Sequence, residues 1–159
     1  MALTTAQRTI LAAHIRANSD PTVVAALAVR NDNAIVTVYN ADSSFVAWRN
    51  QIEPDEYREA LDWTEVDNLT NGKARIWEWL TQGMTVSINA SKANVRAGLN
   101  NAFNNTTTKT NLLAIATRFA TLAESLFATG TGSTQSPGVL VFDGDITAED
   151  VGRALNENP

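Results

Sequence analysis

The chain has 159 residues, of which 44% are hydrophobic, and its formal net charge is only −5. This length and apolar fraction suffice for one domain with a real core, so disorder throughout is excluded. The absence of cysteine excludes disulfides, thiolate nucleophiles and cysteine-bound zinc, and the single histidine, His14, excludes histidine clusters. No run reaches the about 20 apolar residues of a membrane-spanning helix, and residues 1–16 lack the pattern of a signal peptide.

The composition predicts a surface made mainly of neutral polar residues. The chain has 24 Ala, 19 Thr and 16 Asn but only 3 Lys, so its surface depends on uncharged groups. Such a surface repels itself less than one rich in Lys and Glu, and it suits contacts between copies of the chain.

Helix-capping signals mark the first elements. Thr4 and Gln7 match a capping box for a helix that ends at Asn18-Ser19. The predicted apolar face of this helix consists of Ala6, Ile10, Ala13 and Ala17. Asp20-Pro21 then supplies an N-cap and a first helical residue for a second helix over residues 23–29.

The next segments mix β and helical signals. Residues 35–39 (IVTVY) are β-prone and predict a strand or extended segment, and one aromatic turn of helix is predicted at residues 45–49. Pro54, with the acids after it, predicts a helix that runs to Leu61. Residues 63–69 remain ambiguous.

Three further helices are predicted. Thr70 caps one that ends at Gly83, and the second covers residues 91–103. A polar loop at residues 104–108 precedes the strongest pattern of the chain, a helix over residues 109–128. The apolar residues of this helix recur at spacings of three and four, and they are Leu112, Ile115, Phe119, Leu122 and Leu126.

The last thirty residues change in character. Residues 129–138 (TGTGSTQSPG) form a small-residue linker that cannot bury a core, and residues 138–144 predict a single strand. Thr147 and Asp150 form a capping box for a final short helix. The backbone groups of the lone strand need partners, which are either residues 35–39 or the edge of another protein, by β-augmentation.

The predicted fold is therefore mainly α: a small helical bundle with a short β segment and an extended C-terminal arm. Residues 1–128 form the helical body. Residues 129–159 form a docking arm made of the flexible linker, the strand and the short helix. The candidate docking residues of this arm are Thr129, Gly130, Thr131, Gly132, Ser133, Pro137, Val139, Leu140, Val141 and Phe142.

Four tryptophans are more than packing alone requires in a chain of this size. Trp77 and Trp79 point to opposite sides of one predicted helix, so one of them faces the core and the other a partner. Aromatic residues are enriched at interfaces. The candidate subunit-interface aromatics are Trp48, Trp63 and Trp79.

Signals for metal and phosphate binding fail on inspection, and no catalytic residue, metal or cofactor is predicted. The acidic run at residues 143–150 is not a calcium loop, because Ala148 and Ala154 stand where the glycine and the bidentate acid are needed. The small residues at 130–133 lack the lysine of a phosphate-binding loop.

Four acids near the start of the helix at residues 54–61 are the remaining catalytic candidates, and they are Glu53, Asp55, Glu56 and Glu59. A small carboxylate-dependent hydrolase is therefore an alternative, although a solvated first helical turn explains the same acids. A DNA-binding regulator is disfavoured, because 12 bases face 17 acids without a basic run. An acidic passage would instead let DNA through without holding it.

The most specific motif is LFATGTGST at residues 126–134, followed by Ser136-Pro137 and Phe142-Asp143-Gly144. Looser matches lie at Trp48-Arg49, Ala74–Trp77, Asn94–Leu99 and Asp150-Val151. Together these motifs resemble a family of small tailed-bacteriophage proteins, the head-to-tail connectors, also called adaptor or head-completion proteins. Residues 1–44 carry none of this resemblance.

The resemblance implies a virion protein that is made in the bacterial host cytoplasm and lies at the head–tail interface. Connectors of this kind are helical, form rings under the dodecameric portal and continue the DNA channel towards the tail. The implied partners are the portal protein, further copies of the chain in a dodecameric ring, and tail or nozzle proteins. DNA passes through without sequence-specific binding, and no membrane is involved.

The resemblance also implies a role for the arm, since connector arms reach onto the portal or a neighbouring subunit. Residues 129–142 are the part of the chain expected to do this. Another virion role, in tail completion or head decoration, is the first alternative to the connector.

Overall fold

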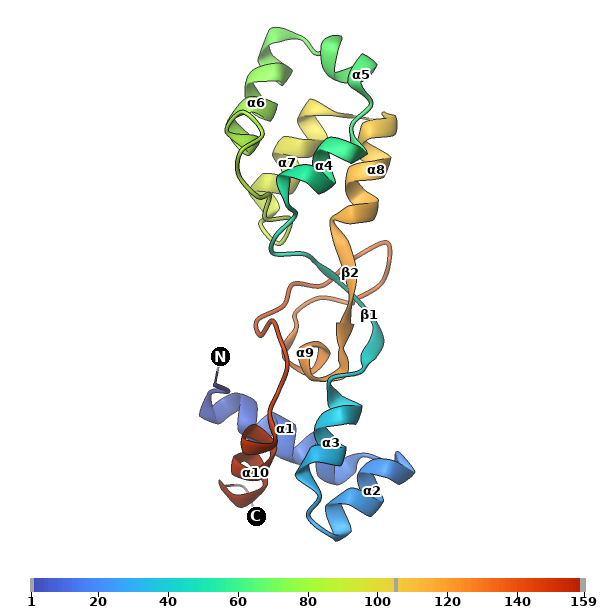
Figure 1. The fold of residues 1–159 in the computed structure, drawn as a ribbon, viewed down its shortest axis with the longest axis vertical. Coiled ribbons are helices and arrows are strands. Elements are labelled where there is room, and N and C mark those ends of the chain that lie inside the picture. Colours follow the sequence, from blue (N-terminus) through green and yellow to red (C-terminus); the bar gives the residue numbers. More distant parts are fainter. Residues whose placement is uncertain (1, 105, 158–159) are drawn as a thin grey trace. The chain divides into compact units, whose positions relative to one another are not determined.

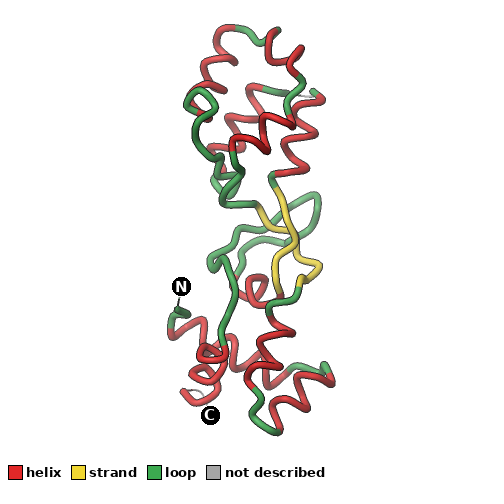
Figure 2. The backbone as a smooth tube through the Cα atoms, in the orientation of Figure 1, coloured by secondary structure: helices red, strands yellow, loops and turns green. Residues whose placement is uncertain are grey.

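The computed structural model describes residues 2–104 and 106–157. These residues form mainly helices with one two-stranded antiparallel sheet, so the predicted mainly α class with a short β segment is confirmed (Figure 1). Figure 2 shows how much of the described chain is loop between these elements. Of the polar loop predicted at residues 104–108, Asn105 lies outside the described residues.

The chain divides into two compact units. Unit 1 comprises Met1–Val46 and Phe119–Pro159, and unit 2 comprises Ala47–Arg118. The chain passes from unit 1 to unit 2 inside strand β1 (Asp42–Trp48) and returns inside strand β2 (Thr117–Thr121). This division differs from the predicted body and arm, because the C-terminal segment belongs to the same unit as the N-terminal helices.

The described part of unit 1 contains helices from both ends of the chain. They are α1 (Thr5–Ala17), α2 (Pro21–Ala28), α3 (Asp32–Tyr39), α9 (Leu122–Phe127) and α10 (Ala148–Glu157). Helix α1 packs against α10, and α2 packs against α3 (Figure 1).

The capping signals predicted for unit 1 are confirmed. The Thr4 hydroxyl accepts the N–H of Gln7, whose side-chain oxygen accepts the N–H of Thr4. Asp20 caps α2 by accepting two backbone N–H groups of its first turn. Thr147 and Asp150 cap α10 by the same reciprocal pair of hydrogen bonds. Each cap stabilises its helix by about 1 kcal/mol.

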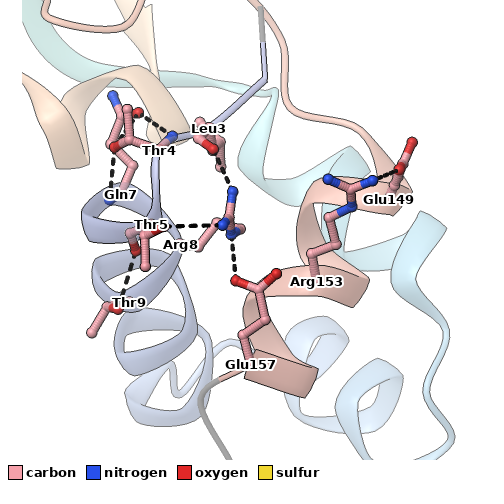
Figure 3. A network of polar contacts seen from close by, with 9 residues as sticks. All are labelled: Leu3, Thr4, Thr5, Gln7, Arg8, Thr9, Glu149, Arg153 and Glu157. Atoms are coloured by element: carbon pink, nitrogen blue, oxygen red, sulfur yellow. Dashed lines mark hydrogen bonds and ion pairs between the residues drawn. The ribbon is translucent and has the colours of Figure 1, made fainter.

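The face that α1 buries differs from the predicted one. Ile10 is 47% exposed, whereas Leu11, Ala12 and Ile15 are buried. These side chains share one core with α3, α9 and α10, which the sequence of α1 alone does not locate. Arg8 links the two ends of the chain at the surface, because its Nε lies 2.6 Å from the Glu157 carboxylate (Figure 3).

The strand predicted at residues 35–39 is wrong, because these residues belong to α3. Asn31 caps this helix by accepting the N–H of Ala34. Ile35 and Tyr39 lie four residues apart and are both fully buried, so one helical face reaches the core. This packing outweighs the modest helix propensity of the β-branched residues.

The helix predicted over residues 109–128 is also wrong. The chain forms α8 (Thr107–Ile115), then β2, then α9. Thr121 caps α9 through a capping box with Glu124, and Phe119 of the predicted apolar stripe is 57% exposed. The helical turn predicted at residues 45–49 is wrong for a related reason, since β1 pairs with β2 there.

Unit 2 is a bundle of α4 (Pro54–Ala60), α5 (Trp63–Asp67), α6 (Asn71–Thr81), α7 (Ala93–Ala102) and α8. The three helices predicted between Pro54 and Phe103 are confirmed to within two residues at each end, although the Thr70 side chain makes no capping hydrogen bond to α6. Helix α4 packs on α8, and α6 packs on α7 (Figure 1).

An aromatic cluster forms the centre of the unit 2 core. The Trp77 ring meets Tyr57 and Phe103 edge-on, at centroid distances of 5.7 and 5.2 Å. Edge-on ring pairs stabilise a core beyond the area that they bury. Burial raises the pKa of the Tyr57 hydroxyl, which donates a hydrogen bond to the carbonyl of Val86.

In unit 1, the predicted linker forms a loop that closes around Phe45 of β1. The Val46 N–H donates to the Gly132 carbonyl and the Gly138 N–H donates to the Val46 carbonyl, each at 2.8 Å. A Cβ on either glycine would overlap the Phe45 ring, and Gly132 also has a φ of 66°. We therefore call residues 129–138 the glycine clasp.

The segment after the glycine clasp completes the core of unit 1. Phe142 is 2% exposed, and its ring meets Phe127 edge-on at 5.8 Å. The buried Glu124 carboxylate accepts the N–H groups of Thr121 and Gly144, at 2.9 and 2.8 Å. The residues predicted to form a separate arm are thus packed into unit 1.

We expect Gly138→Ala to destabilise unit 1 by roughly 1–3 kcal/mol, because the added methyl group must displace the Phe45 ring and the Thr129 carbonyl. Urea unfolding followed by circular dichroism measures this loss. Gly72→Ala in α6 is the matched control, since its Cβ meets no atom within 4 Å and alanine favours a helix. Equal effects of the two substitutions would contradict the packing of the clasp.

We expect Phe142→Ala to destabilise unit 1 by roughly 3–5 kcal/mol, because it leaves a cavity in a closed core. Val141→Ala is the neighbouring control and should change stability by less than about 0.5 kcal/mol, because Val141 is exposed. All four tryptophans lie in unit 2, so circular dichroism reports the loss and tryptophan fluorescence alone does not. A chain lacking residues 129–159 that unfolds like the full chain would refute this role of the C-terminal segment.

Candidate functional site

The ten residues predicted to dock a partner separate into exposed and buried groups. The exposed ones are Thr129, Gly130, Thr131 and Val141, of which Val141 is 60% exposed. The partly buried ones are Ser133, Pro137 and Val139. The buried ones are Gly132, Leu140 and Phe142. The exposed group can contact another protein without unfolding of unit 1, whereas the buried group cannot.

In place of the strand predicted at residues 138–144, unit 1 has an isolated antiparallel bridge between Thr129 and Val139. Thr129 and Val139 exchange two backbone hydrogen bonds of 2.9 Å. The backbone of this segment therefore finds partners in its own chain, and β-augmentation of another protein is not needed to satisfy it.

The predicted interface tryptophans differ in their surroundings. Trp79 is 75% exposed, with the Arg75 guanidinium 5.8 Å from its ring centroid, and Trp63 is 56% exposed. Trp77, on the other side of α6, is buried in the core, as the helical spacing predicts. Trp48 is half-buried, and the Arg96 guanidinium lies over its ring at 4.7 Å.

Beside Trp48, unit 2 has a small apolar cavity of about 50 Å³. It is lined by Trp48, Ala90, Arg96, Leu99, Asn100, Lys109, Leu112, Leu113 and Ala116. We call it the Trp48 cavity. Sequence analysis singled out Trp48 but missed the cavity, because its walls come from β1, α7 and α8, which are distant along the chain.

Of the four carboxylates considered as catalytic candidates, Glu56 is held in place by hydrogen bonds. Both oxygens of Glu56 accept hydrogen bonds from Arg49, at 2.7 and 3.0 Å, and one also accepts the N–H of Glu53. The bonds from Arg49, and then that from Glu53, lower the pKa of Glu56. A general acid needs a raised pKa, so this arrangement opposes that role for Glu56.

Glu65 makes a structural contact that sequence analysis missed. Its two oxygens accept the N–H groups of Thr107 and Thr108 at the start of α8, each at 2.8 Å. Hydrogen bonds lower the pKa of Glu65 to about 2, and the one with the Thr108 side chain has the largest effect. Glu65 is remote in sequence from α8, so local capping patterns do not identify it.

The two units carry very different charge. Unit 1 has nine acids and four bases, so it holds the entire net charge of −5. Unit 2 has eight acids and eight bases and is neutral. Within unit 2 the signs are separated along the chain, with seven acids and one base in residues 53–67 and six bases and one acid in residues 73–118.

Comparisons with known proteins identify no relative of this chain. Scans against protein-family models, curated proteins and solved structures found no match to this chain. Among the residues described here, no three His, Asp or Glu side chains are grouped as metal ligands would be. No described helix is long and apolar enough to cross a membrane.

We expect unit 2 to lose stability as the pH falls from about 4.5 to about 2, because the lowered pKa of Glu65 makes the folded state resist protonation. Above that range the stabilisation is complete. Glu65→Gln should weaken unit 2 at pH 7 and flatten this part of its pH dependence. Urea unfolding followed by tryptophan fluorescence measures it.

The control for Glu65 is Glu59→Gln in α4, because Glu59 is exposed and its side chain has no hydrogen-bond or ion-pair partner among the residues that the structure describes. It should leave the pH dependence unchanged. An identical pH profile for Glu65→Gln and the unmodified chain would show that Glu65 does not anchor α8.

Proposed function

We propose that this chain is a structural protein of a tailed-phage virion and forms a ring under the portal that joins head to tail. The resemblance of residues 126–144 to head-to-tail connectors supplies the setting. The mechanism is assembly, with the portal, further copies of the chain and tail proteins as partners, and without catalysis.

The observation that carries this proposal is that each unit exposes its own large apolar side chains. Unit 1 exposes Ile10, Val24, Val29, Phe119 and Val141. Unit 2 exposes Trp63, Trp79 and Leu113. A ring is built from a heterologous contact, in which one patch of a subunit meets a different patch of the next, so one chain must carry two unlike surfaces.

Charge supports the same role. The excess of acids in unit 1 would repel the phosphates of DNA, so a ring with this unit towards the channel would let DNA pass without binding it. Unit 2 is neutral because eight acids balance eight bases, so copies can pack side by side through this unit with little net repulsion.

Fewer of residues 129–142 can contact a partner than would be the case in a free arm. The glycine clasp and Phe142 belong to the fold of unit 1, so the exposed residues Thr129–Thr131 and Val141 make the contact with the portal or with a neighbouring subunit. Docking then requires no release of the segment, which favours a preformed and rigid contact.

We expect the purified chain to bind portal rings and to add the mass of one complete ring of subunits, because the portal presents a symmetric template. Light scattering of the chain with and without portal measures this. Absence of binding would move the protein to head decoration or tail completion, and lytic activity lost on Glu56→Ala would favour the hydrolase.

Trp79→Ala is the variant that links this result to the exposed surface. It should leave the unfolding midpoint unchanged, since Trp79 is exposed, and it should weaken ring formation if Trp79 is an interface anchor. Thr134→Ala, in the exposed part of the glycine clasp, is the matched control and should assemble normally.

A further inference from the structure

The Trp48 cavity in unit 2 and the loop around Val141 in unit 1 have complementary chemistry. We propose that Val141 of one copy of this chain inserts into the Trp48 cavity of a second copy, with Asp145 beside Arg96 and Lys109. This inference rests on the proposed function and deepens it, because it names the contact between neighbouring subunits of the ring.

The size of the cavity selects a small aliphatic side chain. A water molecule needs roughly 10–15 Å³ on this measure, so a cavity of about 50 Å³ holds three or four waters or the branched end of one valine. The rings of Trp63, Trp79 and Phe119 are too large for it. Its walls are mostly Leu, Ala and Trp side chains, which favour an apolar occupant.

Two positively charged side chains line the cavity, so they favour an occupant that has a carboxylate close to its aliphatic side chain. Arg96 is fixed by its contact with the Trp48 ring and by Nη1, which donates to the carbonyls of Ala90 and Ser91 at 2.7 and 2.8 Å. Lys109 lines the same cavity from α8. Neither Arg96 nor Lys109 has a carboxylate partner among the described residues, so their charge is available to a bound partner.

The segment at Val141 presents the matching groups. Val141 is exposed, and the exposed acid Asp145 follows it four residues later. Arg153 lines the same surface hollow as Asp145 but pairs with Glu149, and the Asp145 carboxylate has no ion-pair partner among the described residues.

This segment is also rigid before any contact is made. Leu140 and Phe142, on either side of Val141, are buried in unit 1. The N–H of Gly144 is held by the buried Glu124 carboxylate at 2.8 Å. A side chain fixed in this way loses little entropy on binding.

The other exposed aliphatic residues of unit 1 fit less well. The acids nearest to Ile10 and Val29 are already paired, since Glu157 binds Arg8 and Asp32 lies 3.8 Å from Arg30, so neither segment offers a free carboxylate to Arg96. Val24 has one acid nearby, Asp20, but its carboxylate already caps α2. Val141 is exposed and is followed by Asp145, whose carboxylate has no hydrogen-bond or ion-pair partner among the described residues.

A second copy is the occupant because both halves of the contact are present in every chain. The two surfaces are unlike, so the contact can repeat from subunit to subunit until a ring closes. A symmetric dimer formed by unit 1 against unit 1 would instead bring together two units that each have a net charge of −5.

Disulfide trapping tests this contact cleanly, since the chain has no cysteine of its own. Val141→Cys chains are mixed with differently sized, tagged Leu113→Cys chains in the presence of oxygen; Leu113 is 45% exposed and lines the cavity. We expect a covalent heterodimer of the two chains. Val29→Cys replaces Val141→Cys as the control, because Val29 is even more exposed, and it should give no heterodimer above background.

Charge reversal tests the polar half. Lys109→Glu in the Leu113→Cys chain should lower the heterodimer yield about tenfold, and Asp145→Lys in the Val141→Cys chain should restore most of it. Lys92→Glu is the matched control, because Lys92 is exposed but does not line the cavity, and it should change the yield little.

The outcomes separate this contact from the proposed function. Portal-bound rings without the heterodimer would overturn the contact and leave the connector role standing. The heterodimer without portal binding would support the contact and overturn the connector role. A chain with both cysteines that forms only an internal disulfide would overturn the proposal, because the contact would then lie within one chain.

Discussion

The fit of the Phe45 ring between Gly132 and Gly138 sets the path of the C-terminal third of unit 1. Any side chain at either glycine would overlap the ring, so the loop approaches β1 closely only because both positions lack a Cβ. The two hydrogen bonds of Val46 then fix the loop on the strand. Once the loop is held there, Phe142 and α10 reach the core that the N-terminal helices leave open. The small residues that look like a flexible linker are therefore a packing requirement.

In each unit a carboxylate also holds backbone N–H groups that are remote from it in the sequence. Glu124 caps its own helix and also holds the N–H of Gly144, and Glu65 holds the first N–H groups of α8. Each satisfies backbone donors that would otherwise lack partners at a helix start or a turn. These two carboxylates thus help to position the turn at Gly144 in unit 1 and the start of α8 in unit 2.

The features that the sequence predicts are those that depend on residues close together in the chain. The caps at Thr4, Asp20 and Thr147 were predictable because each capping side chain and the backbone N–H that it accepts lie within three residues. Residues 35–39 and 109–128 were not, since their structure depends on a buried helical face in one case and on pairing of β2 with β1 in the other. For the candidate site, helical spacing separated buried Trp77 from exposed Trp79. The Trp48 cavity needed the tertiary structure.

The separation of charge between the units bears on how copies of this chain can meet. With all the net charge in unit 1, a contact of unit 1 with unit 1 of another copy brings like charges together, whereas a contact between unit 1 and the basic residues of unit 2 brings opposite charges together. Unlike surfaces that attract each other produce a directional chain of subunits, and only the angle between successive subunits decides whether it closes. In the proposed assembly, a symmetric template such as a portal would impose that angle from outside. The chain would then need only modest affinity for itself, and rings would not form in solution before the template is met.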